Sequence, residues 1–386
     1  MYGTARSFAA IYLSTLLMQV GSTLLITCLA LRLNAAGAGD FQVGALMAAN
    51  ALGMVCGGGA GRLLIARLGH VRACVASTGV IVLAVAGHMA SSALPFWLLL
   101  RAMVGAATIC QLMVVESWLN ERADGKQRGT VLAMYMIATY AGMMLGQLAV
   151  GADDDAGTFA LPAVALAFAL CLAPLALTRT PRPSTGSPAP VSMGRLIRSL
   201  PQPFLVVFVS GMLNGSYFGL SGVFAARQGM DAAAVGCYLA LTVVAGLLAQ
   251  LPLGLLSDRV SRVSLIRGTA LLLALVSMPP GLVQGLSQAT LLVFAFGIGS
   301  LQFCLYPLGA GLANERIDAG MRVPLAGMLL TVFGVGSCIG PLVAGAWMSW
   351  AGPSSLYRFV AVCAAALAVF LGHIQVHGNS RRAFLG

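Results

Sequence analysis

Long apolar segments alternate with short polar ones along the whole chain of 386 residues. A helix needs about 20 apolar residues to cross the ~30 Å hydrocarbon core of a bilayer. Twelve segments reach that length: 8–32, 43–66, 71–93, 96–119, 129–151, 158–178, 204–226, 233–256, 264–285, 289–313, 323–347 and 354–376. The pattern predicts an all-α membrane protein with twelve transmembrane helices.

The segment between the sixth and seventh predicted helices has a different composition. Residues 179–203 contain six prolines, together with serine and glycine, and such a composition is typical of a linker. We therefore expect an N-terminal six-helix bundle in residues 1–178, a cytoplasmic linker in 179–203 and a C-terminal six-helix bundle in 204–386.

A polar run occurs twice in the chain at a fixed distance. Five residue pairs are each 194 positions apart: Asn120 and Asn314, Glu121 and Glu315, Arg122 and Arg316, Asp124 and Asp318, and Arg128 and Arg322. Three glycine pairs in the flanking apolar segments share this offset: Gly105 and Gly299, Gly142 and Gly336, and Gly146 and Gly340. An offset of about half the chain length indicates two homologous halves related by a pseudo-twofold axis, as in many secondary transporters.

Composition excludes several other classes of protein. Hydrophobic residues make up 59% of the chain and charged residues only 9%, whereas soluble domains have about 25% charged residues. The net charge of +11 does not indicate nucleic-acid binding, because the charges lie in short segments between apolar stretches and form no basic face. All nine cysteines fall in apolar stretches without CxxC spacing, so we interpret them as packing residues.

The distribution of basic residues predicts the orientation of the chain. If the N-terminus is cytoplasmic, 18 of the 22 Lys and Arg residues lie on the cytoplasmic side, as the positive-inside rule requires. We therefore expect a multi-pass protein of a bacterial inner membrane with both termini in the cytoplasm. The first apolar stretch is too long for the core of a cleavable signal peptide, so we expect it to remain as the first helix.

One loop carries a recognisable motif. After the eighth predicted helix the sequence is Gly254-Leu255-Leu256-Ser257-Asp258-Arg259-Val260-Ser261-Arg262. It resembles the loop motif G-x-L-x-D-R-x-G-R of the major facilitator superfamily, with Ser261 in place of the second glycine. A weaker copy at 62–72 has Ala66 where the motif has aspartate. With two six-helix halves, the resemblance covers the whole chain and implies transport of a small solute by alternating access.

Other segments resemble particular branches of that superfamily. Arg101-x-x-x-Gly105 resembles a helix-4 motif of proton-coupled members, including drug:proton antiporters. The glycine–proline motif of antiporters lies in helix 5, where Gln147 stands in place of the proline; a similar motif, Gly340-Pro341-x-x-x-Gly345, lies in helix 11 instead. The runs Glu116-Ser117-Trp118-Leu119-Asn120 and Gly69-His70-Val71-Arg72-Ala73 are similar to the uncharacterised bacterial YcaD-like branch.

The resemblance also implies a cytoplasmic gate. In the superfamily the motif aspartate meets the start of helix 11, and an acid at the end of helix 10 meets the motif arginines. The matching residues of this chain are Arg67, Arg72 and Glu121 in the first half and Asp258, Arg259, Arg262 and Glu315 in the second. The alternative is that they are solvated loop charges that set the topology.

Two charged residues lie inside the predicted helix 4. An arginine at a helix centre costs about 2.5–3.5 kcal/mol on insertion scales, so Arg101 is a functional candidate unless it reaches the outer surface. Glu116, one turn from the cytoplasmic end, is the only acid inside a predicted span. The two residues share one helix face but are about 22 Å apart, so they cannot pair. We predict that Glu116 carries the coupled proton and that Arg101 regulates it; an interfacial, hydrated Glu116 is the alternative.

Helices 1, 4, 7 and 10 line the central cavity in the superfamily. Their polar residues in this chain are the candidates for solute binding: Gln19, Thr23, Arg101, Thr108, Gln111, Asn214, Tyr217, Gln302 and Tyr306. For each neutral residue, hydrogen bonding between helices is the competing explanation. As a set they predict a mostly neutral, partly aromatic cavity.

No motif indicates an enzyme. The chain has no P-loop and no GxSxG, HExxH or CxxC sequence, so we expect no ATP hydrolysis, no cofactor and no metal site. We predict a monomeric transporter that exports a small, amphipathic organic solute in exchange for protons, with no nucleic-acid partner. Proton-coupled uptake is the alternative, and a non-transporting membrane receptor is a remote one.

Overall fold

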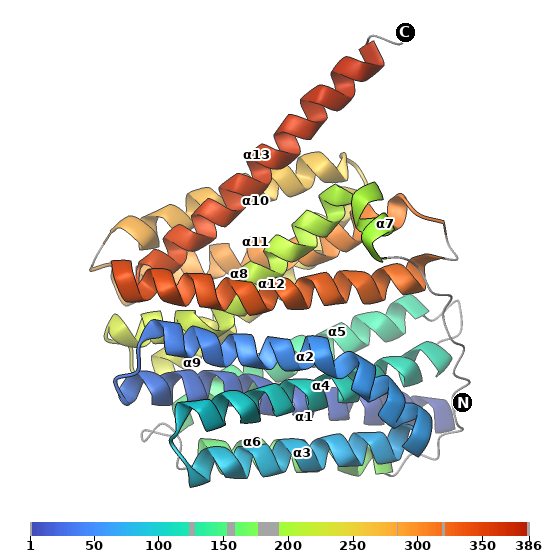
Figure 1. Ribbon diagram of the computed structural model, residues 1–386, viewed down its shortest axis with the longest axis vertical. Coiled ribbons are helices and arrows are strands. Elements are labelled where there is room, and N and C mark those ends of the chain that lie inside the picture. The colour runs from blue at the N-terminus through green and yellow to red at the C-terminus, as the bar shows by residue number, and fades with distance from the viewer. Residues whose placement is uncertain are drawn as a thin grey trace.

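The computed structural model describes residues 2–122, 128–152, 159–176, 193–283, 285–318 and 321–383, and the regular structure in these ranges is entirely helical (Figure 1). The first half contains α1 (Tyr2–Ala35), α2 (Asp40–Leu68), α3 (His70–Ala90), α4 (Leu94–Arg122), α5 (Arg128–Leu148), a short 3₁₀ helix η1 (Ala149–Ala152) and α6 (Ala160–Ala176). The second contains α8 (Pro201–Arg227), α9 (Ala232–Ser257), α10 (Arg262–Leu282), α11 (Gln288–Glu315), α12 (Arg322–Ala351) and α13 (Ser355–Ala383). A seven-residue helix, α7 (Met193–Ser199), precedes α8.

The length of the apolar segments explains where these helices form. Among the described residues, eleven helices are long and apolar enough to cross a membrane, and α6 adds a shorter apolar stretch, Ala160–Pro174. Each predicted span corresponds to one helix, so the prediction of an all-α membrane protein is confirmed. Several helices extend beyond their apolar segments, because polar end residues continue the hydrogen-bonded turns outside the hydrocarbon core.

The packing of the helices repeats between the two halves. In the first half α2 packs on α4, α1 packs on α5 and α6, and α3 packs on α4 and α6. The corresponding pairs of the second half are α9 on α11, α8 on α12 and α13, and α10 on α11 and α13. The two halves meet along a seam, where α2 packs on α12 and α5 packs on α9. These two contacts are equivalent, because α2 corresponds to α9 and α5 corresponds to α12. The predicted pair of six-helix bundles with pseudo-twofold symmetry is therefore confirmed.

The repeated glycines lie at equivalent helix crossings. A side chain at Gly105 in α4 would overlap the backbone of Asn50 in α2, and one at Gly299 in α11 would overlap the backbone of Thr242 in α9. In the same way, Gly142 and Gly146 lie against α1, and Gly336 and Gly340 lie against α8. Glycine allows two helix backbones to approach closely, so the sequence repeat reflects repeated close contacts within each half.

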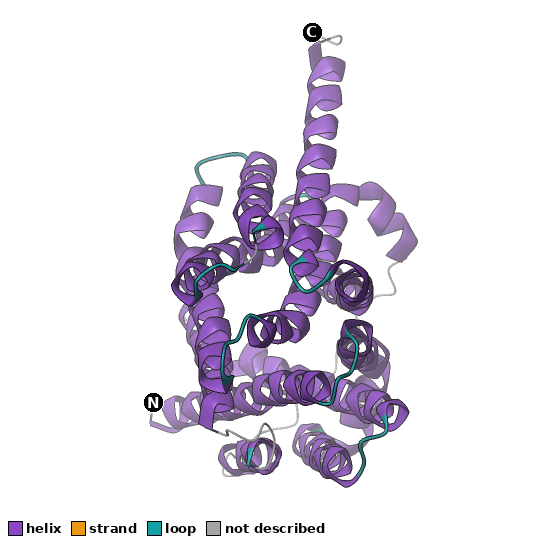
Figure 2. Ribbon diagram, turned by 90° about the vertical axis from the view of Figure 1, so that its left-hand side faces the viewer, coloured by secondary structure: helices purple, strands orange, loops and turns teal. Residues whose placement is uncertain are grey.

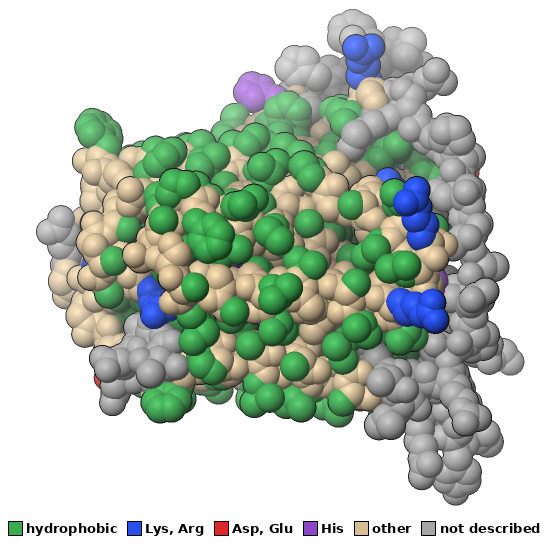
Figure 3. All heavy atoms as spheres, turned by 60° about the horizontal axis from the view of Figure 1, so that its bottom comes forward, with side chains coloured by type: hydrophobic (Ala, Val, Ile, Leu, Met, Phe, Trp, Pro, Cys, Tyr) green, Lys and Arg blue, Asp and Glu red, His purple; other side chains and the backbone are tan. Residues whose placement is uncertain are grey.

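The outer surface is suited to lipid. Large apolar side chains such as Leu83, Leu251 and Trp350 are more than two-thirds exposed, and Figure 3 shows hydrophobic side chains across the middle of one face with Lys and Arg near its ends. Soluble monomers rarely expose contiguous apolar surface on this scale. In Figure 2, which looks along most of the helices, they run side by side as a multi-pass bundle.

The two ends of the bundle differ. The start of α1, helix α7 and the end of α13 lie toward the right in Figure 1, and we call this end the linker face. The connections from α1 to α2 and from α8 to α9 lie at the opposite end, which we call the distal face.

Candidate functional site

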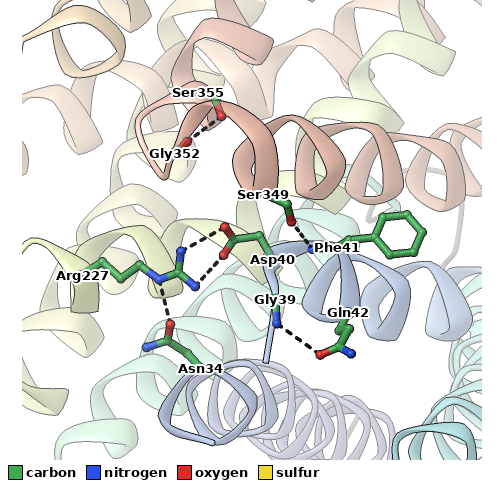
Figure 4. Close-up of polar contacts among 9 residues, drawn as sticks. All are labelled: Asn34, Gly39, Asp40, Phe41, Gln42, Arg227, Ser349, Gly352 and Ser355. Atoms are coloured by element: carbon green, nitrogen blue, oxygen red, sulfur yellow. Dashed lines mark hydrogen bonds and ion pairs between the residues drawn. The ribbon is translucent and has the colours of Figure 1, made fainter. Parts of the chain in front are cut away.

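An ion pair joins the two halves at the distal face (Figure 4). Nη1 of Arg227, at the end of α8, donates a hydrogen bond of 2.9 Å to Oδ2 of Asp40, and Nη2 lies 2.9 Å from Oδ1. Nε of Arg227 also donates to Oδ1 of Asn34 at 2.9 Å. The Asp40 side chain is only 3% exposed and begins α2, where the helix dipole favours a negative charge. The pair therefore ties the α1–α2 connection of the first half to α8 of the second.

Helices α2 and α12 close the distal face beside this ion pair. The backbone N–H of Phe41 donates to Oγ of Ser349 at 3.1 Å. Gly44 lies against the carbonyl group of Pro341, and Gly345 lies against the first turn of α2. The glycine–proline segment of α12 thus forms a backbone contact between the halves, and side chains at either glycine would prevent it.

The seam is different toward the linker face. Among the described residues, α4 and α11 do not form a closely packed pair. Glu116 in α4 is exposed there. Its carboxylate interacts electrostatically with the phenol groups of Tyr135 in α5 and Tyr306 in α11. Glu116 therefore lies between the halves, and within the described residues it forms no ion pair or hydrogen bond.

Aromatic side chains from both halves surround this part of the seam. The ring of Tyr306 packs edge-on against Phe333 of α12, with centroids 5.2 Å apart. Closer to the distal face, Phe303 packs edge-on against Tyr140 of α5 at 6.1 Å and against Phe218 of α8 at 5.5 Å. We call Tyr140, Phe218 and Phe303 the aromatic cluster. The side chains of Met143 and Met144 pack on it, and Gln250 of α9 donates a hydrogen bond to the Tyr140 hydroxyl.

Two of the four neutral polar residues predicted to bind solute in the first half, Thr23 and Gln111, are engaged within that half. Gln111 donates from Nε2 to Oγ1 of Thr78 in α3 at 2.6 Å, and it is 1% exposed. The Thr23 hydroxyl is buried and donates to the carbonyl of Gln19 at 2.7 Å. Gln19 itself is half-buried, as is Thr108.

Two of the four candidates in the second half, Tyr217 and Asn214, are likewise hydrogen-bonded within their own half. The hydroxyl of Tyr217 is hydrogen-bonded to Thr242 at 3.0 Å and to Tyr238 at 3.3 Å, inside the helix bundle. Asn214 donates to the backbone carbonyl of Ser210 at 2.8 Å. Two further candidates differ in exposure: Gln302 is completely buried with no partner for its amide among the described residues, whereas Tyr306 is half-buried at the seam.

Arg101 lies within the first half and not beside Glu116. Its side chain is 1% exposed, and its Nε has no hydrogen-bond partner among the described residues. It interacts electrostatically with His88 of α3, as Arg32 of α1 does. The His88 ring packs against Trp97 at 5.4 Å. The structure therefore separates the two charges of α4: Arg101 faces α1 and α3, and Glu116 faces the seam.

The predicted gate residues of the second half lie together at the linker face. Nε of Arg262 is 3.0 Å from Oε1 of Glu315, and Nη2 of Arg262 is 3.7 Å from Oδ1 of Asp258. These three side chains border an open cavity of about 460 Å³. Arg259 is exposed, as are the first-half residues Arg67 and Arg72. The side chain of Glu121 lies outside the described residues.

Comparison with known proteins identifies the family. A family model described as Major Facilitator Superfamily matches residues 11–322 and also residues 203–383, so residues 203–322 are covered by both matches. The chain belongs to the Major Facilitator Superfamily. A relative from Salmonella paratyphi A, an uncharacterized MFS-type transporter YcaD, is 28% identical over 364 residues, which is 94% of each chain. The protein of that name from Salmonella enteritidis PT4 is 31% identical over 268 residues, or 69% of each chain.

Solved transporter structures share the superfamily fold. The nucleoside transporter NupG has a TM-score of 0.77 at 13% identity, covering 97% of this chain and 99% of NupG. A bacterial homologue of the human lysosomal transporter Spinster, in an inward-facing and unoccupied conformation, has a TM-score of 0.77 at 14% identity and covers 95% and 94%. This superfamily member is therefore a multi-pass secondary transporter, and the prediction of its family is confirmed.

The structure also brings together the two runs that resemble the YcaD-like branch of the superfamily, residues 69–73 and 116–120. Nε2 of His70, at the start of α3, lies 3.1 Å from Oγ of Ser117 in α4, and the His70 ring packs against Trp118 at 6.3 Å. The two runs therefore meet, and they fix α4 against α3 directly beside Glu116.

Sequence reasoning missed the distal ion pair and the aromatic cluster. Asp40 is the only acid of α2, Arg227 is the only charged residue of α8, and both lie at distal helix ends, which was the available signal. No repeat offset links them, since one begins the second helix and the other ends the seventh long helix. The aromatic cluster could not be distinguished by sequence from residues that face lipid.

Proposed function

We propose that this transporter exports a small, amphipathic organic solute across a bacterial inner membrane in exchange for protons. The observation that supports this is the unequal closure of the seam. The distal end is held shut by the Asp40–Arg227 pair and by the α2–α12 contact, whereas Glu116 is accessible near the linker face. A seam that is closed at one end and open at the other fits one state of an alternating-access cycle.

In this proposal residues 1–178 and 204–386 move as two rigid halves about the linker 179–203. The linker face is cytoplasmic, because the positive-inside rule puts the majority of the basic residues on the side that carries the start of α1 and the end of α13. The present conformation is then open toward the cytoplasm, in agreement with its similarity to the inward-facing Spinster homologue.

Glu116 is the coupling residue in this proposal. Among the described candidate spans it is the only acid that is not at the end of a helix. An ionised carboxylate inside a membrane protein is costly unless it is hydrated or paired, and protonation removes that cost. A change of charge at a residue shared by both halves would alter the relative stability of the open and closed seam.

Two sets of distance measurements by electron paramagnetic resonance test the cycle without knowledge of the solute. One spin-label pair, Ala36→Cys with Gln228→Cys, reports on the distal face; the other, Leu68→Cys with Val260→Cys, reports on the linker face. All four positions are exposed. Lowering the pH should shorten the linker-face distance and lengthen the distal one in the same molecules, and Glu116→Gln should abolish this response. Distances that never change in opposite directions would refute alternating access.

The direction of transport requires a flux assay. We suggest proteoliposomes loaded with cationic, neutral and anionic amphipathic dyes, with the pH gradient imposed in either direction. Antiport predicts dye movement against the direction of proton flow, and symport predicts movement with it. Asp231→Asn removes an exposed carboxylate at the start of α9 and serves as the control for Glu116→Gln.

A further inference from the structure

The geometry points to a bulky organic cation with few hydrogen-bonding groups as the solute of the Glu116 site. This inference rests on the proposed transport function and names the class of solute. It begins with which polar groups remain accessible. Six of the nine residues predicted to bind solute are either hydrogen-bonded within their own half or fully buried: Thr23, Arg101, Gln111, Asn214, Tyr217 and Gln302. Few accessible groups thus remain to recognise a solute through many hydrogen bonds.

That scarcity argues against nucleosides and peptides. A solute rich in hydrogen-bonding groups must exchange its bonds with water for bonds with the protein, and each unpaired buried group weakens binding. The similar fold of the nucleoside transporter NupG therefore does not extend to the chemistry of this seam.

The charge at the seam selects a cation. Among the described residues Glu116 has no ion pair or hydrogen bond, although it lies between the two halves, near the phenol groups of Tyr135 and Tyr306. A carboxylate within a membrane protein is normally paired or protonated. A positively charged solute would supply the missing partner, and an anionic solute would be repelled.

Aromatic rings supply apolar surface near Glu116. Tyr135 and Tyr306 lie close enough to Glu116 to interact with it electrostatically, and Phe333 packs on Tyr306. The faces of aromatic rings attract cations, and rings also bury the apolar body of a large ion.

Two isosteric probes separate charge from hydrophobicity. Tetraphenylphosphonium and tetraphenylborate have nearly the same size and apolar surface but opposite charge. Equilibrium binding of each to the purified full chain in nanodiscs should show at least a tenfold preference for the phosphonium. Glu116→Gln should remove that preference, whereas Glu116→Asp should keep most of it, so that loss of charge is separated from a folding defect. Asp231→Asn is the matched control and should bind as the unmodified protein does.

The contribution of the rings is tested at Tyr306. Replacing it with leucine keeps an apolar side chain but removes the ring, and we expect a several-fold loss of phosphonium affinity with little change for the borate. Uridine and dialanine, tested in the same nanodiscs, should not bind.

Several outcomes would overturn the inference. They are equal binding of the two probes, unchanged phosphonium affinity in Glu116→Gln, or binding of uridine or dialanine in preference to the phosphonium. If any of these occurs while the spin-label distances still change in opposite directions with pH, only the solute class is wrong. If those distances do not change, the proposed transport cycle itself has failed.

Discussion

The sharpest test of the distal closure is to remove the charge of Asp40. Replacing it with asparagine keeps the shape of the side chain but leaves Arg227 with a neutral partner. In the closed state Arg227 donates one hydrogen bond of 2.9 Å to this carboxylate and places a second nitrogen 2.9 Å from its other oxygen. We expect Asp40→Asn to shift the equilibrium toward a distal face that is open.

The size of the shift follows from the geometry. A hydrogen bond to a charged group contributes about 1.5–3 kcal/mol. Asp40 is 3% exposed, which favours the upper part of that range, but the Arg227 side chain is 32% exposed and water screens it. We therefore expect a loss of about 1–2 kcal/mol, or roughly a 5- to 30-fold change in the ratio of closed to open states.

The spin-label pair at positions 36 and 228 measures this ratio directly. In Asp40→Asn the population with a long distal distance should grow, and the pair at positions 68 and 260 should report a matching closure of the linker face. Asp231→Asn is the control, because Asp231 begins α9 in the second half, and its carboxylate accepts a hydrogen bond of 2.7 Å from the backbone of Ala234. The control loses a helix-capping charge without loss of any described contact between the halves.

Identical distance distributions for Asp40→Asn and the unmodified protein would refute the reasoning. They would mean that the α2–α12 backbone contact alone holds the distal face closed.

Three further changes test other parts of the structure. Gly44→Leu should hold the distal face open at every pH, because its side chain would occupy the position of an α12 carbonyl group; the same distal spin labels detect it. Glu315→Gln should lower the thermal unfolding temperature only slightly, since its pair with Arg262 is partly exposed and such pairs contribute less than about 1 kcal/mol. Gln111→Leu should destabilise the protein by about 1–3 kcal/mol, because the buried hydrogen bond from Gln111 to the Thr78 hydroxyl is lost while that hydroxyl keeps its bond to the Cys74 carbonyl, without changing phosphonium affinity.

The helices and the repeat could be predicted because both depend on local or periodic features of the sequence. A span is defined by about 20 consecutive apolar residues, and the two halves are defined by pairs such as Gly105 and Gly299 at a constant offset. The structure then shows why those glycines recur, since both lie at the crossing of equivalent helices. The loop motif likewise placed Asp258, Arg262 and Glu315 in one group, and these three lie together.

The site was harder to predict because it depends on how each helix is rotated about its own axis. Arg101, Thr108 and Glu116 share one face of α4 in sequence, yet Arg101 is buried toward α3 and Glu116 is exposed at the seam. Over fifteen residues, a small tilt of the helix and long side chains can direct two such residues to different neighbours. The Asp40–Arg227 pair joins residues 187 positions apart, and no local pattern connects them.

The two ends of the seam differ in charge, and this difference explains how leakage could be avoided. At the distal end an acid meets a base, so closure forms an ion pair. At the linker end Glu116 has no basic partner among the described residues, so closure would bury an unpaired carboxylate at a cost of several kcal/mol. Binding of a proton or of a cationic solute removes that cost, and only the occupied site can then switch readily. Glu116→Gln should therefore switch when empty, and the linker-face pair should report a closed population at pH 8 that the unmodified protein lacks. A linker face that stays open in this variant would show that the charge of Glu116 does not control the switch.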